Sequence, residues 1–120
     1  FDPQLNSIPH PVPVAVLIDR FTASSGEGLA ICFSGRRNTK FFGERTWGIA
    51  TANAEYKLRC GATMYLTIAY DADRNGKLFK DGVEPDFAIP EQTDLDAVLE
   101  KAQEWLTDCG TDLDSFRESL

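Results

Sequence analysis

Residues 24–27, Ser-Ser-Gly-Glu, are the part of the sequence whose residue types and spacing could do chemistry. A serine hydroxyl can attack a carbonyl carbon, and the first backbone N–H groups of a helix can stabilise the oxyanion that forms. Ser24 is the candidate nucleophile, and the amides of Ser25 and Gly26 are the candidate oxyanion donors. The same residues match the S-x-x-E capping box, in which Ser24 and Glu27 close the first turn of a helix. Both interpretations use the same geometry, so both stay open.

A strand, a tight turn and a helix are predicted around these residues. The apolar run 12–18 fits a strand buried on both faces, as in a parallel sheet. From Ser24 onward the apolar residues follow the period of a helix, on which Cys32 is expected to be a small core residue, and Gly35 ends the helix. Residues 40–43 form the next short strand, so the three elements make a βαβ unit with a right-handed crossover.

The rest of the chain adds strands and a helical region. Residues 62–70 alternate in polarity and predict a half-buried strand that follows a hairpin turn. Residues 87–89 predict a short last strand. An apolar stripe that begins after Thr93 predicts a helix that ends at Gly110, followed by a short helix over residues 112–119.

Length and composition indicate a single domain, since the chain has 120 residues of which 42% are hydrophobic. We divide it into an extended lead-in over residues 1–11, a core over residues 12–90 and acidic helices over residues 91–120. The chain begins in Pro-rich sequence without Met, so we expect a fragment of a longer protein. No apolar run approaches the roughly 20 residues that a membrane span needs.

The net charge of −7 is concentrated in the last quarter of the chain. Residues 1–90 hold ten acidic and ten basic side chains, whereas residues 91–120 hold nine acidic and two basic ones. Phosphate backbones would be repelled by the acidic part, and no basic stripe occurs elsewhere. Nucleic acid is therefore not expected as a partner.

No metal or cofactor site is predicted. The three cysteines are widely separated, and with a single histidine, His10 between prolines, they do not form a zinc pattern. Residues 71–76, DADRNG, resemble the start of a calcium loop, but its twelfth position is Gly82 instead of glutamate. Asn75 and Gly76 fit a hairpin turn better.

Four motifs in one order resemble the tail-specific, or C-terminal-processing, serine protease family. They are T-A-S-x-x-E after a strand, G-E-x-T-x-G, L-x-x-G before a strand and a closing G-[IV]-x-P-D, at residues 22–27, 43–48, 58–61 and 82–86. The resemblance covers residues 12–90 and only the C-terminal part of such a protease core. It implies a Clp-protease/crotonase-like α/β fold, with βαβ units and a mixed sheet flanked by helices.

The resemblance implies a serine-type endopeptidase without a cofactor, acting on a peptide or protein. Its nucleophile would be Ser24, and the amides of Ser25 and Gly26 would supply part of the oxyanion hole. Members of this family often work in the bacterial cell envelope. The sequence does not distinguish that compartment from the cytoplasm, and it does not indicate an oligomeric state.

The family's general base is missing from the matched positions. The lysine that follows the G-E-x-T-x-G loop in tail-specific members corresponds to Ile49, and an assisting glutamine corresponds to Asn53. A second branch, which resembles the tricorn core, takes a histidine from its N-terminal half and a glutamate at the position of Phe79. We therefore expect a base upstream of this sequence. Lys57 and Lys77 are conceivable substitutes, although charged residues near turns are usually solvated.

Two other interpretations remain. The loss of both expected bases suits a catalytically inactive relative that binds peptides or other ligands as a scaffold. A crotonase-like enzyme acting on acyl thioesters would use backbone donors alone, and the T-A-S-x-x-E turn would have no role in it.

Overall fold

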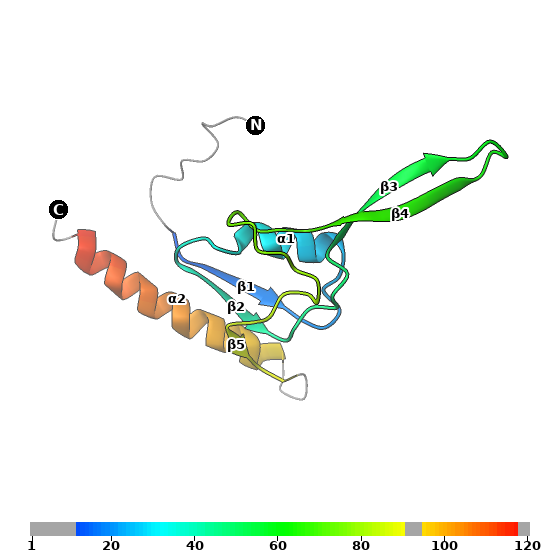
Figure 1. Cartoon of the computed structure of the whole chain (residues 1–120). Helices are drawn as coiled ribbons and strands as arrows, with labels where there is room; N and C mark the ends of the chain where they lie inside the picture. Colours follow the sequence, from blue (N-terminus) through cyan, green and yellow to red (C-terminus); the bar gives the residue numbers. More distant parts are fainter. Residues whose placement is uncertain (1–11, 91–94, 118–120) are drawn as a thin grey trace.

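The computed structural model describes residues 12–90 and 95–117 (Figure 1). The lead-in over residues 1–11 and the start of the helix predicted at Thr93 lie outside the described residues. In chain order the elements are β1 (Val14–Ile18), α1 (Ser25–Phe33), β2 (Thr39–Gly43), β3 (Thr51–Lys57), β4 (Thr63–Tyr70), β5 (Phe87–Ala88) and α2 (Leu95–Arg117).

The predicted βαβ unit is confirmed. Strand β1 pairs in parallel with β2, from Val14 opposite Thr39 to Ile18 opposite Gly43, and α1 connects the two strands. Strand β5 pairs in parallel with the other edge of β2, so the strand order is β1-β2-β5. Figure 1 shows this sheet between α1 and α2, as an α/β fold requires.

Strand β2 is the central strand, and its two phenylalanines face opposite layers because successive strand residues alternate between faces. Phe41 belongs to a buried cluster that includes Ile31 of α1. Phe42 is fully buried on the other face, where its ring stacks on Phe87 at 4.9 Å between ring centroids and meets Trp105 of α2 at 5.9 Å. The prediction that residues 12–18 are buried on both faces is wrong, because β1 lies at the sheet edge and only Ile18 is buried among the described residues of this run.

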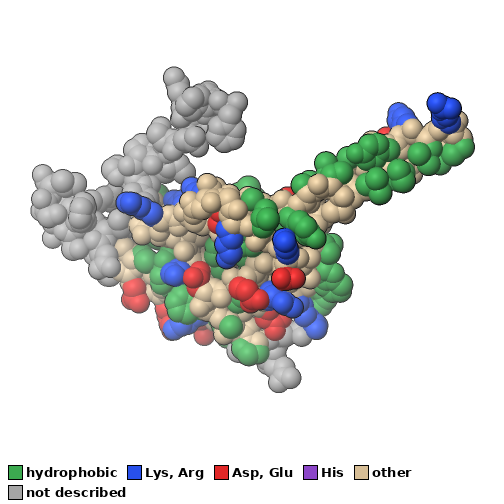
Figure 2. Space-filling model, viewed as in Figure 1, with side chains coloured by type: hydrophobic (Ala, Val, Ile, Leu, Met, Phe, Trp, Pro, Cys, Tyr) green, Lys and Arg blue, Asp and Glu red, His purple; other side chains and the backbone are tan. Residues whose placement is uncertain are grey.

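Strands β3 and β4 form a separate antiparallel hairpin that projects from the body of the protein as an arm (Figure 1). The predicted strand and turn are confirmed, since Gly61 adopts φ +85° and the Leu58 N–H donates to the Ala62 carbonyl. The predicted half-burial is wrong: every residue of β4 is exposed, and Figure 2 shows hydrophobic side chains along the arm. An alternating strand has an apolar face, but that face is buried only where a second layer of the protein packs against it. No described residues cover the arm.

The acidic C-terminal region is one helix instead of two. Helix α2 runs without interruption from Leu95 to Arg117, so the predicted end at Gly110 and the separate helix over residues 112–119 are wrong. A glycine inside a helix costs only about 1 kcal/mol relative to alanine, which a helix of this length tolerates. Neither described helix is long and apolar enough to cross a membrane.

The DADRNG segment forms a turn that packs against the C-terminal end of α1. The Asp73 carboxylate accepts hydrogen bonds from the Asn75 and Lys77 amides, and from the Ser34 hydroxyl at 3.0 Å. The Arg74 guanidinium donates to the Cys32 carbonyl at 2.8 Å. The turn prediction is confirmed, but the prediction that Cys32 is a core residue is wrong, because its side chain is exposed.

Candidate active site

Ser24 lies between the carboxyl end of β1 and the first residue of α1, with its side chain exposed. Its backbone has φ 50° and ψ −116°, a conformation that is rare for any residue other than glycine. Such strain costs about 1–3 kcal/mol and persists only where the surroundings hold it in place. The predicted tight turn between strand and helix is confirmed, and Ser24 is exposed at its end.

The turn before Ser24 is fixed by Asp19, which sequence reasoning had not singled out. The Asp19 carboxylate accepts hydrogen bonds from the Phe21 amide at 3.0 Å, and from both the amide and the hydroxyl of Thr22 at 2.7 and 2.8 Å. An aspartate that accepts from amides two and three residues ahead is a common turn former. Asp19 thus holds the chain that leads from β1 to Ser24.

The two amides predicted as oxyanion donors differ in their hydrogen bonding. Ser25 is the first residue of α1, and an N–H at that position has no acceptor within its own helix. The Gly26 N–H donates to the Ala23 carbonyl at 2.9 Å. The Gly26 N–H is therefore already engaged within the turn, whereas the Ser25 N–H has no acceptor inside α1.

Glu27 is completely buried and anchors the Ser24 turn. One carboxylate oxygen accepts the Ser24 N–H at 2.9 Å, which is the carboxylate half of the predicted capping box. The same carboxylate accepts hydrogen bonds from the Thr46 hydroxyl at 2.6 Å and from the amides of Gly48 and Ile49 at 2.8 and 2.9 Å. Burial raises the pKa of the Glu27 carboxyl, but these four hydrogen bonds together lower it below its ordinary value of 4.5.

The G-E-x-T-x-G loop and the G-V-E-P-D segment meet beside this carboxylate. The Thr46 amide donates to the Val83 carbonyl at 3.1 Å, and the Val83 amide donates to the Thr46 hydroxyl at 2.7 Å. The Trp47 amide donates to the Thr22 carbonyl at 2.9 Å, which ties the loop to the Ser24 turn. Three of the four sequence motifs are thus joined by hydrogen bonds around Glu27.

The Gly-Val-Glu-Pro-Asp segment is also anchored to the central strand. The Asp86 carboxylate accepts the Phe41 amide at 2.8 Å and the Lys40 ammonium at 3.0 Å, and the Asp86 amide donates to the Phe41 carbonyl at 2.8 Å. These hydrogen bonds fix the position of the segment along β2. Because Val83 belongs to the same segment, they also help to fix its position beside Thr46.

The positions at which the resemblance implied a base hold no base. Ile49 has a side chain that is 46% exposed, and Phe79 is 4% exposed within the core cluster. Asn53 lies in β3, where its side-chain carbonyl oxygen accepts a hydrogen bond from the Thr67 hydroxyl at 2.9 Å.

The two lysines considered as substitute bases also lie elsewhere. Lys57 ends β3 on the projecting arm, and the Lys77 ammonium lies 4.9 Å from the centre of the Phe79 ring. None of the contacts found among the described residues joins these side chains to Ser24.

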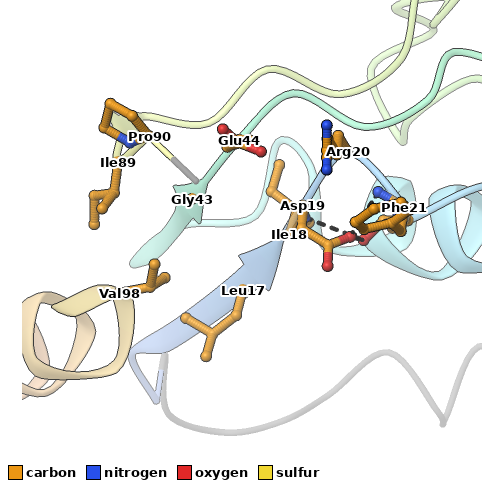
Figure 3. Close-up of a pocket in the computed structure, with 11 residues that line it drawn as sticks. Leu17, Ile18, Asp19, Arg20, Phe21, Gly43, Glu44, Ile89, Pro90 and Val98 are labelled. Carbon is orange, nitrogen blue, oxygen red and sulfur yellow. Dashed lines mark hydrogen bonds between the residues drawn. The ribbon is translucent and has the colours of Figure 1, made fainter. Parts of the chain in front are cut away.

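A cavity of about 280 Å³ opens at the carboxyl ends of β1 and β2, beside the turn that leads to Ser24 (Figure 3). Its walls are mostly apolar, and Figure 3 shows the Asp19 carboxylate hydrogen-bonded within its own turn. Ligands of α/β proteins commonly bind at this edge of the sheet. Thr22 lines the cavity, but Ser24 does not. The lining residues are Leu17, Ile18, Asp19, Arg20, Phe21, Thr22, Gly43, Glu44, Ile89, Pro90 and Val98.

Among the described residues, no group of three or more histidine, cysteine or acidic side chains could hold a metal ion. In the calcium-like loop, the Asp73 carboxylate accepts hydrogen bonds from the Asn75 and Lys77 amides of its own turn.

Comparison with known proteins identifies the family. The family model described as peptidase family S41 matches residues 3–89. The nisin-resistance protein of Lactococcus lactis subsp. lactis is 37% identical over 94 residues, which are 78% of this chain and 28% of that protein. The chloroplastic carboxyl-terminal-processing peptidase 2 of Arabidopsis thaliana is 31% identical over 86 residues, which are 71% of this chain and 17% of that protein.

Solved structures agree with this assignment. A lipoprotein from Streptococcus agalactiae superposes with a TM-score of 0.68 at 33% identity, over 84% of this chain and 33% of that one. The photosystem II D1 C-terminal processing protease superposes with a TM-score of 0.59 at 32% identity, over 72% of this chain and 23% of that one. The chain spans less than a third of the length of the curated relatives named above. Since the family model covers well over half of its 120 residues, and carboxyl-terminal-processing peptidases share both its sequence and its fold, the chain belongs to peptidase family S41.

Proposed function

We propose that this chain is the nucleophile-bearing part of a serine endopeptidase and that Ser24 is the nucleophile. The observation that carries the proposal is the conformation of Ser24: an exposed serine at the start of α1 is held in a strained backbone geometry by the buried Glu27 carboxylate. A residue that only capped the helix would not require this strain, since N-cap residues usually have an ordinary β-region backbone. Strained residues of this kind cluster at active sites.

The proposed reaction is acyl transfer. The Ser24 hydroxyl oxygen attacks the carbonyl carbon of the scissile peptide bond while a base outside the described residues takes its proton. The Ser25 N–H and the positive end of α1 stabilise the oxyanion. The proton then passes to the amine as the C–N bond breaks, and water hydrolyses the resulting ester at Ser24. Gly26 can contribute a second donor only by sharing the hydrogen bond that it makes to Ala23.

The substrate is a peptide or protein, as for peptidases in general. The apolar cavity beside Thr22 offers a place for one apolar side chain of the peptide, because its walls include Leu17, Ile89 and Val98. We choose two test substrates from the names of the similar proteins. They are nisin, from the nisin-resistance protein, and a protein with a cleavable C-terminal extension, from the carboxyl-terminal-processing peptidases.

A fluorophosphonate probe on the full-length protein tests the proposal. The probe is expected to label Ser24, and the Ser24→Ala variant is expected to lose both labelling and peptide cleavage. Ser25→Ala is the matched control, because it removes the neighbouring hydroxyl but keeps the backbone amide, so it should still be labelled. Equal labelling of the wild type and Ser24→Ala would contradict the proposal. Full-length protein that binds peptides but never cleaves them would favour the inactive relative instead.

A further inference from the structure

Three groups form a continuous hydrogen-bonded path into the Ser24 turn. The Val83 N–H donates to the Thr46 hydroxyl oxygen at 2.7 Å. The Thr46 hydroxyl donates to one Glu27 oxygen at 2.6 Å, and the other Glu27 oxygen accepts the Ser24 N–H at 2.9 Å. The directions are fixed, because an amide can only donate, so the single hydroxyl proton of Thr46 is left for the carboxylate.

We propose that Thr46 is a positioning residue for Ser24, whose buried hydroxyl joins the Val83 backbone to the carboxylate that holds the Ser24 backbone. This inference rests on the proposed function of Ser24. It gives the threonine of the G-E-x-T-x-G loop a role in the reaction without contact to the substrate.

The site leaves Thr46 little freedom to move. Its side chain is 2% exposed and that of Glu27 is 0% exposed, so the link between them lies in the interior. Gly82 lies directly against it: a Cβ atom at Gly82 would come within 2.7 Å of the Thr46 hydroxyl oxygen and 3.0 Å of its carbonyl oxygen. The backbone of residues 82–83 therefore lies directly against the hydroxyl that donates to the Glu27 carboxylate.

The two carboxylate oxygens of Glu27 divide their donors evenly. One oxygen accepts from Thr46 and Gly48, and the other accepts from Ser24 and Ile49. Without the Thr46 hydroxyl, the first oxygen keeps only one donor, and the carboxylate loses a hydrogen bond that fixes its rotation. The Ser24 backbone, whose φ of 50° is maintained by that carboxylate, then becomes less well held.

The experiment compares Thr46→Val, which keeps the shape and removes the hydroxyl, with Thr46→Ser, which keeps the hydroxyl. In the full-length protein, Thr46→Val is expected to lower kcat about 10- to 100-fold with KM changed less than about threefold, because the nucleophile is misplaced while substrate contacts remain. Thr46→Ser is expected to keep kcat within about threefold. Thr67→Val is the matched control, since it removes an exposed hydroxyl that donates to Asn53 on the arm.

Hydrogen exchange at the Ser24 amide gives a second measurement that does not depend on activity. Thr46→Val is expected to speed this exchange at least about tenfold, whereas Thr46→Ser and Thr67→Val leave it unchanged. Folded Thr46→Val protein with unchanged kcat and unchanged exchange would overturn the inference, and so would Thr46→Ser protein as impaired as Thr46→Val. If the wild type neither cleaves peptides nor reacts at Ser24, the proposed function fails, and the exchange rates alone decide whether Thr46 holds Ser24.

Discussion

The buried Glu27 carboxylate accepts the backbone N–H of the exposed Ser24 at 2.9 Å, so a core residue fixes the conformation of a surface residue three positions away. This bond is one of four that the carboxylate accepts, and the other three come from the loop that follows β2. The Ser24 turn and that loop are therefore one hydrogen-bonded unit, and the stability of this unit determines how well Ser24 is placed.

Replacing Glu27 by glutamine should destabilise the protein by about 2–4 kcal/mol. Hydrogen bonds to a charged acceptor contribute about 1.5–3 kcal/mol each, and the amide NH₂ of glutamine cannot accept from the donors that face it. Urea denaturation of the full-length protein measures the loss. Glu55→Gln is the matched control, because Glu55 is exposed on the arm and accepts a 3.2 Å hydrogen bond from the exposed Tyr65 hydroxyl, so its effect should stay within about 0.5 kcal/mol. Similar losses in the two variants would contradict the role of Glu27.

Glu27 should also make stability depend on pH in a defined direction. Its pKa in the folded protein lies below its ordinary value of 4.5, so the folded state favours the ionised form. The stabilisation is therefore fully present above pH 4.5 and is lost as the pH falls through the lowered pKa of the folded state. The difference in unfolding free energy between wild type and Glu27→Gln should be constant from about pH 7 to about pH 5 and shrink below that. A difference that grows as the pH falls would show that Glu27 is protonated in the folded protein.

Gly82→Ala and Gly61→Ala should separate steric overlap from backbone strain. Both glycines have positive φ, +92° and +85°, so alanine pays the same left-handed penalty of about 1–2 kcal/mol at each. At Gly61 a Cβ would meet no atom within 4 Å, whereas at Gly82 it would come within 2.7 Å of the Thr46 hydroxyl oxygen. Urea denaturation should therefore find Gly82→Ala less stable than Gly61→Ala by at least about 1 kcal/mol. Equal losses would mean that the 82–86 segment can move away from Thr46.

The βαβ unit could be predicted from the sequence because its signals are local. A short apolar run, a helix-starting serine and a stop at Gly35 lie within about 25 residues of one another, and the structure has β1, α1 and β2 in those places. The contacts of the Phe42 ring, stacked on Phe87 and tilted against Trp105, could not be predicted. They join residues that are far apart in the chain, and nothing in the spacing of these residues indicates that they meet.

Burial was the least predictable property. The alternation in residues 62–70 correctly indicated a strand, but alternation does not say whether another layer covers it, and the described residues leave β4 exposed on both faces. Burial on helix α1 was equally hard to predict. Its apolar residues occupy a wider part of the helix surface than the core covers, so Ile31 is buried whereas Leu29 and Cys32 are exposed.

Part of the candidate site could be predicted from the sequence. The S-x-x-E spacing predicted the contact between Ser24 and Glu27, because residues three apart meet in the first turn of a helix. The further bonds from Thr46, Gly48 and Ile49 depend on how a loop about 20 residues later folds back, which no local pattern encodes. The roles of Ser24, Ser25 and Gly26 in catalysis stay predictions, as does the division of the chain into lead-in, core and acidic helical region.

The cavity beside the Ser24 turn should select peptides by an apolar side chain, which Val98→Phe tests by partly filling it. Val98 of α2 lines the cavity together with Leu17 and Ile89 (Figure 3). In the full-length protein, Val98→Phe should lower kcat/KM about 10- to 100-fold for peptides that place leucine or phenylalanine in the cavity, because a pocket contact contributes about 1–3 kcal/mol. For peptides with alanine at that position, kcat/KM should fall much less. Fluorophosphonate labelling of Ser24 should not change. Leu99→Phe is the matched control, since Leu99 is the next residue of α2, is 45% exposed and does not line the cavity. If Val98→Phe reduced the cleavage of all peptides equally, the cavity would affect the fold of the site instead of the choice of substrate.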